Sequence, residues 1–301
     1  MAFDEFALEG LDVDEPVFYL WQNAPAVIIG LNQSAYAEVN LPFLEARGIV
    51  LARRVTGGGA VFHDLGNLNY SIVGPVKDLQ NAYGWVAEAL RQMGVPATRS
   101  GRNDILVDGR KCSGYAKRLS RSRMMIHGTL MWDVDLEALT QALAVPGSKL
   151  EAAGVASVRS RVANLKDYLP GLADIDAFRH DLHTILAGTD GEISLTAAQL
   201  DAVGRMADQK FRTWDWNFGR SPLTTFQNTV KFPCGTVTAH YSLNHGVFSE
   251  LHFTGDFIGA RPAAELAGKL IGHPVNEISG FDVSRYFDGL SSPDFLTLFV
   301  A

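Results

Sequence analysis

The residues best suited to chemistry lie in three polar segments, and the first is a glycine-rich stretch that follows two arginines. It runs from Arg53 to Gly66 with the sequence Arg-Arg-Val-Thr-Gly-Gly-Gly-Ala-Val-Phe-His-Asp-Leu-Gly. Three successive glycines permit positive φ angles and let a ligand approach the main chain closely. Backbone N–H groups and a guanidinium both donate to phosphate or carboxylate oxygens. The stretch therefore suits an anionic ligand, although a glycine-rich hairpin without a ligand fits the triplet equally well.

The other two polar segments lie downstream. They comprise Gly101-Arg102-Asn103-Asp104 with the run from Asp108 to Gly114, and then Ile126-His127-Gly128-Thr129. Each has a plain structural explanation when it is taken alone. The first fits a turn at the start of a strand, the lysine within it fits a solvent-exposed hairpin, and the histidine fits a satisfied core residue.

Apolar periodicity and turn residues predict the elements that must hold these segments. We expect strands at residues 17–21, 26–30, 61–63, 69–73, 104–107, 111–117 and 124–132. We expect helices at about 36–46, 79–93, 135–143, 175–186 and 195–211, with a polar loop at 157–164. Strands and helices do not alternate strictly, so we predict an α+β fold with a mostly antiparallel sheet backed by helices.

The C-terminal part of the chain changes character after the aromatic segment Trp214 to Pro222. Short alternating segments at 236–241 and 247–253 predict strands, and a proline in the first turn opens a helix at about 262–270. We therefore predict a larger domain at residues 1–219 and a small α+β accessory domain at residues 220–301.

Composition indicates an ordinary soluble globular protein, with 47% hydrophobic and 20% charged residues in 301. The formal net charge of −7 argues against a dedicated nucleic-acid binder, although residues 117–123 hold four cations. Cys112 and Cys234 form neither a disulfide framework nor a metal-ligand spacing. No apolar run is long enough to span a bilayer. The acidic N-terminus lacks a targeting pattern, so we expect a cytoplasmic location.

Taken together, in this order and spacing, the segments resemble the lipoate–protein ligase A family. The matching segments are Trp21-Gln22-Asn23, Val27 to Gly30, Arg53 to Gly66, Gly101 to Asp104, Arg110 to Gly114, His127 to Leu130, Ser157 to Leu165 and Trp216 to Gly219. They cover nearly the whole chain. The resemblance implies a catalytic domain with the fold of biotin–protein ligases and class II aminoacyl-tRNA synthetases, followed by a small accessory domain.

The resemblance also implies a two-step reaction that uses ATP and Mg²⁺. In the first step the carboxylate of lipoate attacks the α-phosphorus of ATP, giving lipoyl-AMP and pyrophosphate. In the second step the ε-amine of a specific lysine attacks the acyl carbonyl and releases AMP. The implied acceptors are apo-lipoyl domains of 2-oxoacid dehydrogenase E2 subunits and the glycine cleavage H protein, and the implied state is a monomer.

Site residues follow from the resemblance position by position. Lys111 matches the catalytic lysine, whose compact ammonium can bridge the phosphate and the acyl oxygen. Arg54 matches the arginine that contacts the ATP phosphates, and Asp104 is a candidate for phosphate-bound Mg²⁺. The expected ATP and lipoyl-adenylate contacts are Arg54, Gly58, Gly59, Ala60, Val61, Phe62, His63, Asn103, Asp104, Lys111, Ser113, Gly114, His127, Gly128 and Thr129. An apolar slot for the acyl chain is expected from Leu31, Val61, Tyr70 and Met125.

Three alternatives stay in view. An octanoyl- or lipoyltransferase would need no ATP but an activated thiol, and Cys112 is better interpreted as a small buried filler. A biotin ligase would carry a Gly-Arg-Gly-Arg-x-Gly-Arg loop, which we do not find in the sequence. A catalytically silent acyl-binding relative is the third. Separately, the basic segment 117–123 either steers an acidic acceptor or protects a hairpin from edge pairing.

Overall fold

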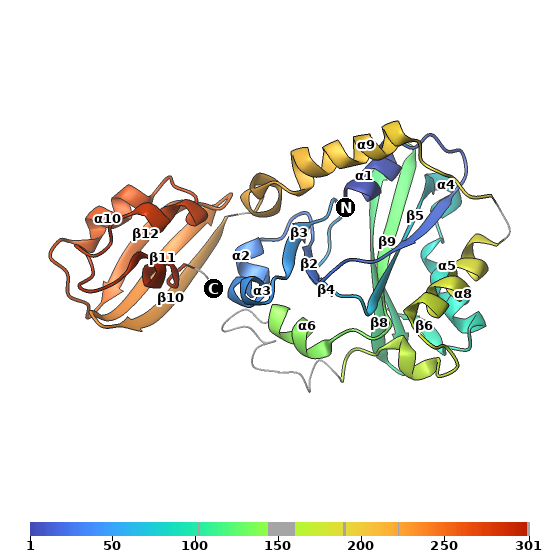
Figure 1. The fold of residues 1–301 in the computed structure, drawn as a ribbon, viewed down its shortest axis with the longest axis horizontal. Helices are drawn as coiled ribbons and strands as arrows, with labels where there is room; N and C mark the ends of the chain where they lie inside the picture. The colour runs from blue at the N-terminus through green and yellow to red at the C-terminus, as the bar shows by residue number, and fades with distance from the viewer. Residues whose placement is uncertain (101–102, 144–159, 189–190, 222, 300–301) are drawn as a thin grey trace.

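The computed structural model describes residues 1–100, 103–143, 160–188, 191–221 and 223–299. A six-stranded sheet forms the centre of the larger part of these residues, with the strand order β1-β5-β9-β8-β7-β6 (Figure 1). All its neighbouring strands pair antiparallel. The bounds are β1 Val17–Trp21, β5 Asn67–Pro75, β6 Ala97–Ser100, β7 Asp104–Val107, β8 Arg110–Ser120 and β9 Arg123–Met131. The predicted α+β fold with a mostly antiparallel sheet is confirmed.

A second, three-stranded sheet carries the glycine-rich stretch. Its central strand β2 (Ala26–Ile29) pairs in parallel with β3 (Val50–Arg53) and antiparallel with β4 (Val61–His63). The glycines therefore connect the two outer strands and pass the end of the central one. The strands expected at 17–21 and 26–30 are both present, but they belong to different sheets.

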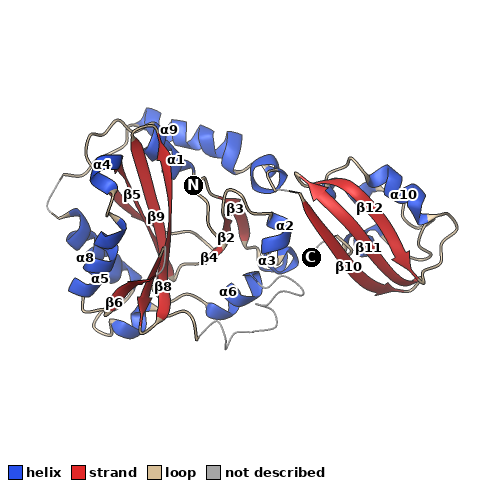
Figure 2. Cartoon of the chain, turned by 180° about the vertical axis from the view of Figure 1, so that it is seen from behind, coloured by secondary structure: helices blue, strands red, loops and turns tan. Residues whose placement is uncertain are grey.

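The two faces of the six-stranded sheet are covered differently. Figure 2 shows α5 and α8 on one face and the small sheet on the other. The face under α5 and α8 buries a large apolar cluster that includes Tyr70, Leu90 and Phe178. On the other face, α1 packs beside α9 over a cluster that includes Phe6 and Met125. The helices of this part are α1 Ala2–Glu9, α2 Ala35–Glu38, α3 Leu41–Arg47, α4 Val76–Leu79, α5 Tyr83–Gln92, α6 Leu136–Leu143, η1 Leu165–Tyr168, α8 Ile175–Ala187, α9 Ala197–Met206, η2 Ala207–Phe211 and η3 Asp215–Gly219.

Several boundaries differ from expectation for local reasons. The helix expected at about 36–46 is split into α2 and α3, because Asn40 leaves helical geometry and its side chain accepts from the Phe43 N–H as an N-cap. The helix expected at 195–211 changes at Ala207 into the π-helical η2. Helix α1 and strand β6 were not expected from the sequence. The matched residues Gly101 and Arg102, and residues 157–159, lie outside the described part of the chain.

The C-terminal residues form a separate three-stranded antiparallel sheet with short helices on one side (Figure 1). The bounds are β10 Thr224–Phe232, β11 Gly235–Asn244, β12 Val247–Gly255, α10 Ala263–Leu270, η4 Val275–Gly280 and α11 Ser292–Leu296. Strands β11 and β12 and helix α10 match predicted elements, whereas β10, η4 and α11 were not expected. Tyr36 of α2 packs into the apolar core of this sheet, so the two parts share a contact. The division of the chain at 219/220 stays a prediction. Across the described residues, we find no helix with the length and apolar character that a membrane crossing needs.

Candidate functional site

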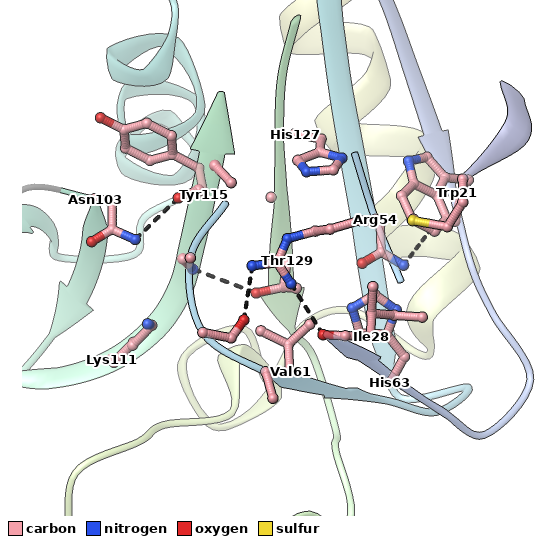
Figure 3. A pocket seen from close by; sticks show the side chains of 18 residues that line it. Trp21, Ile28, Arg54, Val61, His63, Asn103, Lys111, Tyr115, His127 and Thr129 are labelled. Atoms are coloured by element: carbon pink, nitrogen blue, oxygen red, sulfur yellow. Dashed lines mark hydrogen bonds between the residues drawn. The ribbon is translucent and has the colours of Figure 1, made fainter. Parts of the chain in front are cut away.

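A cavity lies between the two sheets of the larger part, and the three polar segments meet in it (Figure 3). Its lining consists of Met1, Trp21, Ile28, Arg54, Gly58, Gly59, Ala60, Val61, His63, Asn69, Asn103, Lys111, Gly114, Tyr115, Ala116, His127, Gly128 and Thr129. Figure 3 places Asn103 and Lys111 on one side of the cavity and Trp21 and His63 on the other. The cavity therefore has a cationic, amide-bearing end and an aromatic end.

Three of the expected contact residues lie outside this lining. Phe62 is buried in the core of the small sheet, because strand alternation turns its neighbours Val61 and His63 towards the cavity instead. Ser113 is a buried residue of β8. Asp104 reaches the site through Lys111. Of the expected apolar slot only Val61 lines the cavity; the described positions of Leu31, Tyr70 and Met125 are in the packed clusters around it.

The glycine loop is held by tight backbone packing at Gly30 and Gly58. A Cβ on Gly30 would stand 2.1 Å from the carbonyl oxygen of Gly58, which is far inside contact distance. Gly58 has φ +96°, a conformation that favours glycine. A Cβ on Gly59 would meet no protein atom within 4 Å, and this residue faces the cavity. Packing therefore explains Gly30 and Gly58, whereas Gly59 keeps free space at the cavity wall.

Arg54 holds the same loop through hydrogen bonds to its backbone and to Thr56. Its Nη2 donates to the carbonyl oxygens of Gly57 and Gly59, each at 2.8 Å, and its Nη1 donates to Ile28 O at 3.0 Å. Its Nε donates to Thr56 Oγ1 at 3.0 Å. Burial lowers the pKa of Arg54 to about 10, so the guanidinium stays charged at neutral pH. In this geometry Arg54 fixes the loop carbonyls while lining the cavity.

Arg53 points the other way and does not line the cavity. It is fully buried. Its guanidinium donates to the backbone carbonyls of Gly30, Leu31, Gln33, Trp216 and Asn217 and to Ser221 Oγ. The indole N–H of Trp216 donates back to Arg53 O at 2.8 Å. Arg53 thus ties β3 to the segment that leads into the C-terminal sheet.

Lys111 stands at the start of β8 and forms an ion pair with Asp104 across the β7–β8 ladder, with Nζ 2.8 Å from Oδ1. Both side chains are partly exposed. A Cβ on Gly114 would lie 2.8 Å from the same Nζ. The glycine therefore leaves room for the Lys111 ammonium. Asn103 donates from Nδ2 to Tyr115 O at 3.0 Å, and Tyr115 N–H donates to Asn103 O. These bonds hold the polar segment against β8.

A buried relay connects α1 to the glycine loop. His127 Nδ1 is 2.9 Å from Asp4 Oδ2, and His127 Nε2 is 2.7 Å from Thr56 Oγ1. Burial by itself would raise the pKa of Asp4, but hydrogen bonding and attraction from His127 lower this pKa well below its usual range. The order Asp-His-Thr resembles a hydrolase triad. Thr56 is 1% exposed and does not line the cavity, so its hydroxyl supports the loop.

The cysteines and the basic segment also have defined surroundings. Cys112 is buried with Sγ 3.4 Å from Ile105 O, and burial raises its thiol pKa to about 12. Arg118 and Arg123 donate to backbone carbonyls of Val55 and of the α1 region respectively. Residues 117–120 belong to β8 and Arg123 to β9, so the hairpin tip is limited to Arg121 and Ser122.

Sequence reasoning missed some lining residues and one supporting carboxylate. Trp21 stood in a matched segment but was not assigned to the site, and Asn69 was assigned to a strand only. Asp4 was treated as part of an acidic terminus. The signal for Asp4 was present, since Asp4 falls on the face that carries apolar residues of an eight-residue helix. A carboxylate on a buried face requires a partner.

Two family models match the chain. The lipoyl protein ligase A/B catalytic domain matches residues 1–187, and the bacterial lipoate protein ligase C-terminus matches residues 221–299. The lipoate-protein ligase LplJ of Bacillus subtilis is 34% identical over 99% of this chain and 95% of its own length.

Two solved structures extend the comparison. A bi-partite lipoate protein ligase from Thermoplasma acidophilum, described with its E2 lipoyl domain, has a TM-score of 0.66 at 31% identity and covers 73% of this chain and 90% of its own. A lipoate-protein ligase A bound with ATP has a TM-score of 0.63 at 30% identity, over 73% of this chain and 92% of its own.

Proposed function

The chain belongs to the lipoate–protein ligase family, and from this premise we propose that it activates lipoate with ATP and transfers it to a lysine. The intermediate is lipoyl-AMP, formed with release of pyrophosphate. The acceptors are apo-lipoyl domains of 2-oxoacid dehydrogenase E2 subunits and the glycine cleavage H protein. The observation that carries the proposal is the single cavity in which Lys111, the glycine loop and an aromatic end come together.

The cationic end suits the first step of this reaction. Attack of a carboxylate on the α-phosphorus concentrates negative charge on the phosphate oxygens, and fixed donors aimed at that charge supply much of the catalysis. Lys111 has a partly exposed ammonium on the cavity wall. Asn103 lies at the same end of the cavity (Figure 3), and the bare backbone at Gly59 also lines the cavity. We assign Lys111 to the α-phosphate and the acyl oxygen, and Asn103 to the nucleotide.

The aromatic end suits the acyl chain. Trp21, Ile28 and Val61 offer apolar surface there, and they replace the slot expected from Leu31, Tyr70 and Met125. An acyl chain seated against them places its carboxylate towards Lys111. The activated acid then lies between two sheets, where exclusion of water protects it from hydrolysis before the acceptor amine attacks.

Mg²⁺ enters this proposal as a companion of the ATP phosphates. Mg²⁺ is usually held by one or two carboxylates together with substrate phosphates. In the described residues, no group of three or more His, Cys, Asp or Glu side chains is placed to hold a metal ion. Asp104 is the carboxylate beside Lys111 that fits this role. Bound Mg²⁺ would neutralise phosphate charge.

An ATP-independent transferase is the second candidate, and it needs a thiolate nucleophile. Burial raises the thiol pKa of Cys112 to about 12, and Cys112 does not line the cavity. Cys234 lies in the turn between β10 and β11 of the C-terminal part, and burial raises its pKa as well. These surroundings support the ligase over the transferase.

The test combines purified protein, an apo-lipoyl domain and lipoate, with and without ATP. We expect transfer only with ATP or with preformed lipoyl-AMP. Lys111→Ala should lower the rate on the order of 10²–10³-fold. Cys112→Ser is the matched control on the neighbouring position and should remain active. Equal transfer without ATP, or inactivity of the Cys112 variant with Lys111→Ala active, would end the ligase proposal.

A further inference from the structure

His63 is a buried imidazole with one unused nitrogen in the cavity wall. Its side chain is 2% exposed and belongs to the cavity lining. Nδ1 lies 3.0 Å from the side-chain amide nitrogen of Asn23, whereas Nε2 has no hydrogen-bond partner among the described residues. A buried polar nitrogen without a partner is costly, so its presence calls for an explanation.

The contact with Asn23 determines which nitrogen carries the proton. Burial, together with the positive charge of Arg54, lowers the pKa of His63 to about 3, so the ring is neutral at physiological pH. A neutral imidazole has one donor and one acceptor nitrogen. The amide NH₂ of Asn23 can only donate, so Nδ1 is the acceptor and Nε2 carries the proton. His63 therefore presents an unpaired N–H donor.

The position of this donor in the cavity limits what it can meet. The Trp21 ring packs edge-on against His63, with 6.0 Å between ring centroids, and Figure 3 shows both rings across the cavity from Lys111. If the reacting carboxylate lies at Lys111, the distal end of the acyl chain lies near Trp21 and His63. Ile28 and Val61 add apolar surface to the wall, and the side-chain amide of Asn69, which also lines the cavity, is bonded to Trp21 O and to Asn67. An N–H donor in an apolar wall selects for a ligand with an acceptor at that depth.

We propose that His63 Nε2–H donates a hydrogen bond to a dithiolane sulfur of lipoate and so makes this ligase prefer lipoate to octanoate. Sulfur is a weak acceptor, but the tail of octanoate has no acceptor at all and would leave the N–H unpaired. A site that hydrogen-bonds its substrate rejects an analogue without the partner atom for this reason. The inference rests on the proposed ligase function.

The first test is the ratio of kcat/KM for lipoate to kcat/KM for octanoate in the full chain with ATP and an apo-lipoyl domain. His63→Leu removes the donor, and we expect the ratio to fall about tenfold, near the upper limit for one neutral hydrogen bond. His63→Gln keeps an N–H donor near the position of Nε2 and should retain most of the preference. Ile28→Val changes the shape of the same wall without any N–H and should move both substrates together.

A second measurement does not depend on turnover. In protein labelled with ¹⁵N-histidine, the Nε2–H resonance of His63 should shift when lipoate binds and remain in place when octanoate binds. An equal ratio in wild type and His63→Leu, or identical shifts with both acids, would overturn the inference. If neither acid supports ATP-dependent transfer, the failure belongs to the proposed function. If the wild type transfers both acids with equal efficiency, the proposed role of His63 is wrong and the proposed ligase function stands.

Discussion

Arg53 and Arg54 are neighbours in sequence and serve two different regions of the molecule. Arg53 is directed into the packed joint between β3 and residues 216–221, where every partner is protein. Arg54 is directed to the cavity side and holds the carbonyls of the glycine loop. Burial lowers the pKa of each to about 10, so both carry charge at neutral pH. Strand alternation, and not residue type, separates a structural arginine from one at the site.

Replacing Arg53 should have the largest effect on stability. Arg53→Met leaves several buried carbonyl oxygens without donors, each of which costs about 1–3 kcal/mol. We expect the free energy of unfolding to fall by about 3 kcal/mol or more, measured by urea denaturation. Arg54→Met should destabilise less, because two of the residues whose carbonyls it holds, Ile28 and Gly59, line the cavity, where water can replace the lost donor. Equal losses in both variants would remove the distinction between the two regions.

Gly30 and Gly59 show the same difference between a residue required for packing and a residue at the cavity wall. Gly30→Ala should destabilise the protein, because the new Cβ meets the Gly58 backbone at 2.1 Å. Gly59→Ala has free space around it and should leave the melting temperature within about 2 °C, since a surface-like change rarely exceeds 0.5 kcal/mol. We expect Gly59→Ala to lower lipoate-dependent pyrophosphate release about tenfold, because misplacement of reacting groups costs rate. A stable Gly30 variant, or a fully active Gly59 variant, would contradict this assignment.

The buried carboxylate of Asp4 should make the stability of the fold depend on pH. Because its folded pKa is depressed, its stabilising contribution is complete above the ordinary value of 3.8 and is lost as the pH falls below that value. Asp4→Asn should therefore be less stable than wild type by about 1.5–3 kcal/mol across pH 5–7, a typical value for a hydrogen bond to a charged group. The gap should narrow below about pH 3.8 in chemical denaturation. A gap that is constant down to pH 2 would show that the carboxylate charge is not involved.

The basic segment 117–123 also contains cations with different surroundings, some bonded to the protein and some exposed. Arg123 donates to carbonyls of the α1 region, whereas Lys117 and Arg121 are exposed. Charge reversal at Lys117 and Arg121 together should raise the KM for an acidic acceptor severalfold and flatten its salt dependence, because exposed charges act mainly on encounter. Arg123→Glu should instead lower the melting temperature. Unchanged acceptor kinetics in the double variant would remove this hypothesis.

The sequence was sufficient to predict those parts of the cavity wall that come from unbroken polar segments of the chain. The lack of strict alternation between strands and helices led to the correct type for the six-stranded sheet, and most expected contact residues line one cavity. The part that it could not supply depends on register and alternation. Phe62 faces the core because side chains alternate along a strand. Ser113 is buried next to a register shift in the β7–β8 pairing, and the buried role of Asp4 depends on a contact 123 residues away.

The matched segments also could not show how the loop is held. Arg54 was expected to face phosphate, and the structure adds its bonds to Gly57 and Gly59. The fold decides which of two adjacent arginines lines the cavity, since both have the same chemistry. Tertiary contacts of this kind leave no local pattern in the sequence.

The central claim is that the cavity forms and holds lipoyl-AMP, and native mass spectrometry tests it most directly. The full chain is incubated with lipoate, ATP and Mg²⁺ in the absence of any acceptor. We predict one non-covalent lipoyl-AMP per chain in the wild type and in Cys112→Ser, and none in Lys111→Ala. A lipoyl group bound covalently to a cysteine, or no adenylate at all in an active wild-type preparation, would contradict the account.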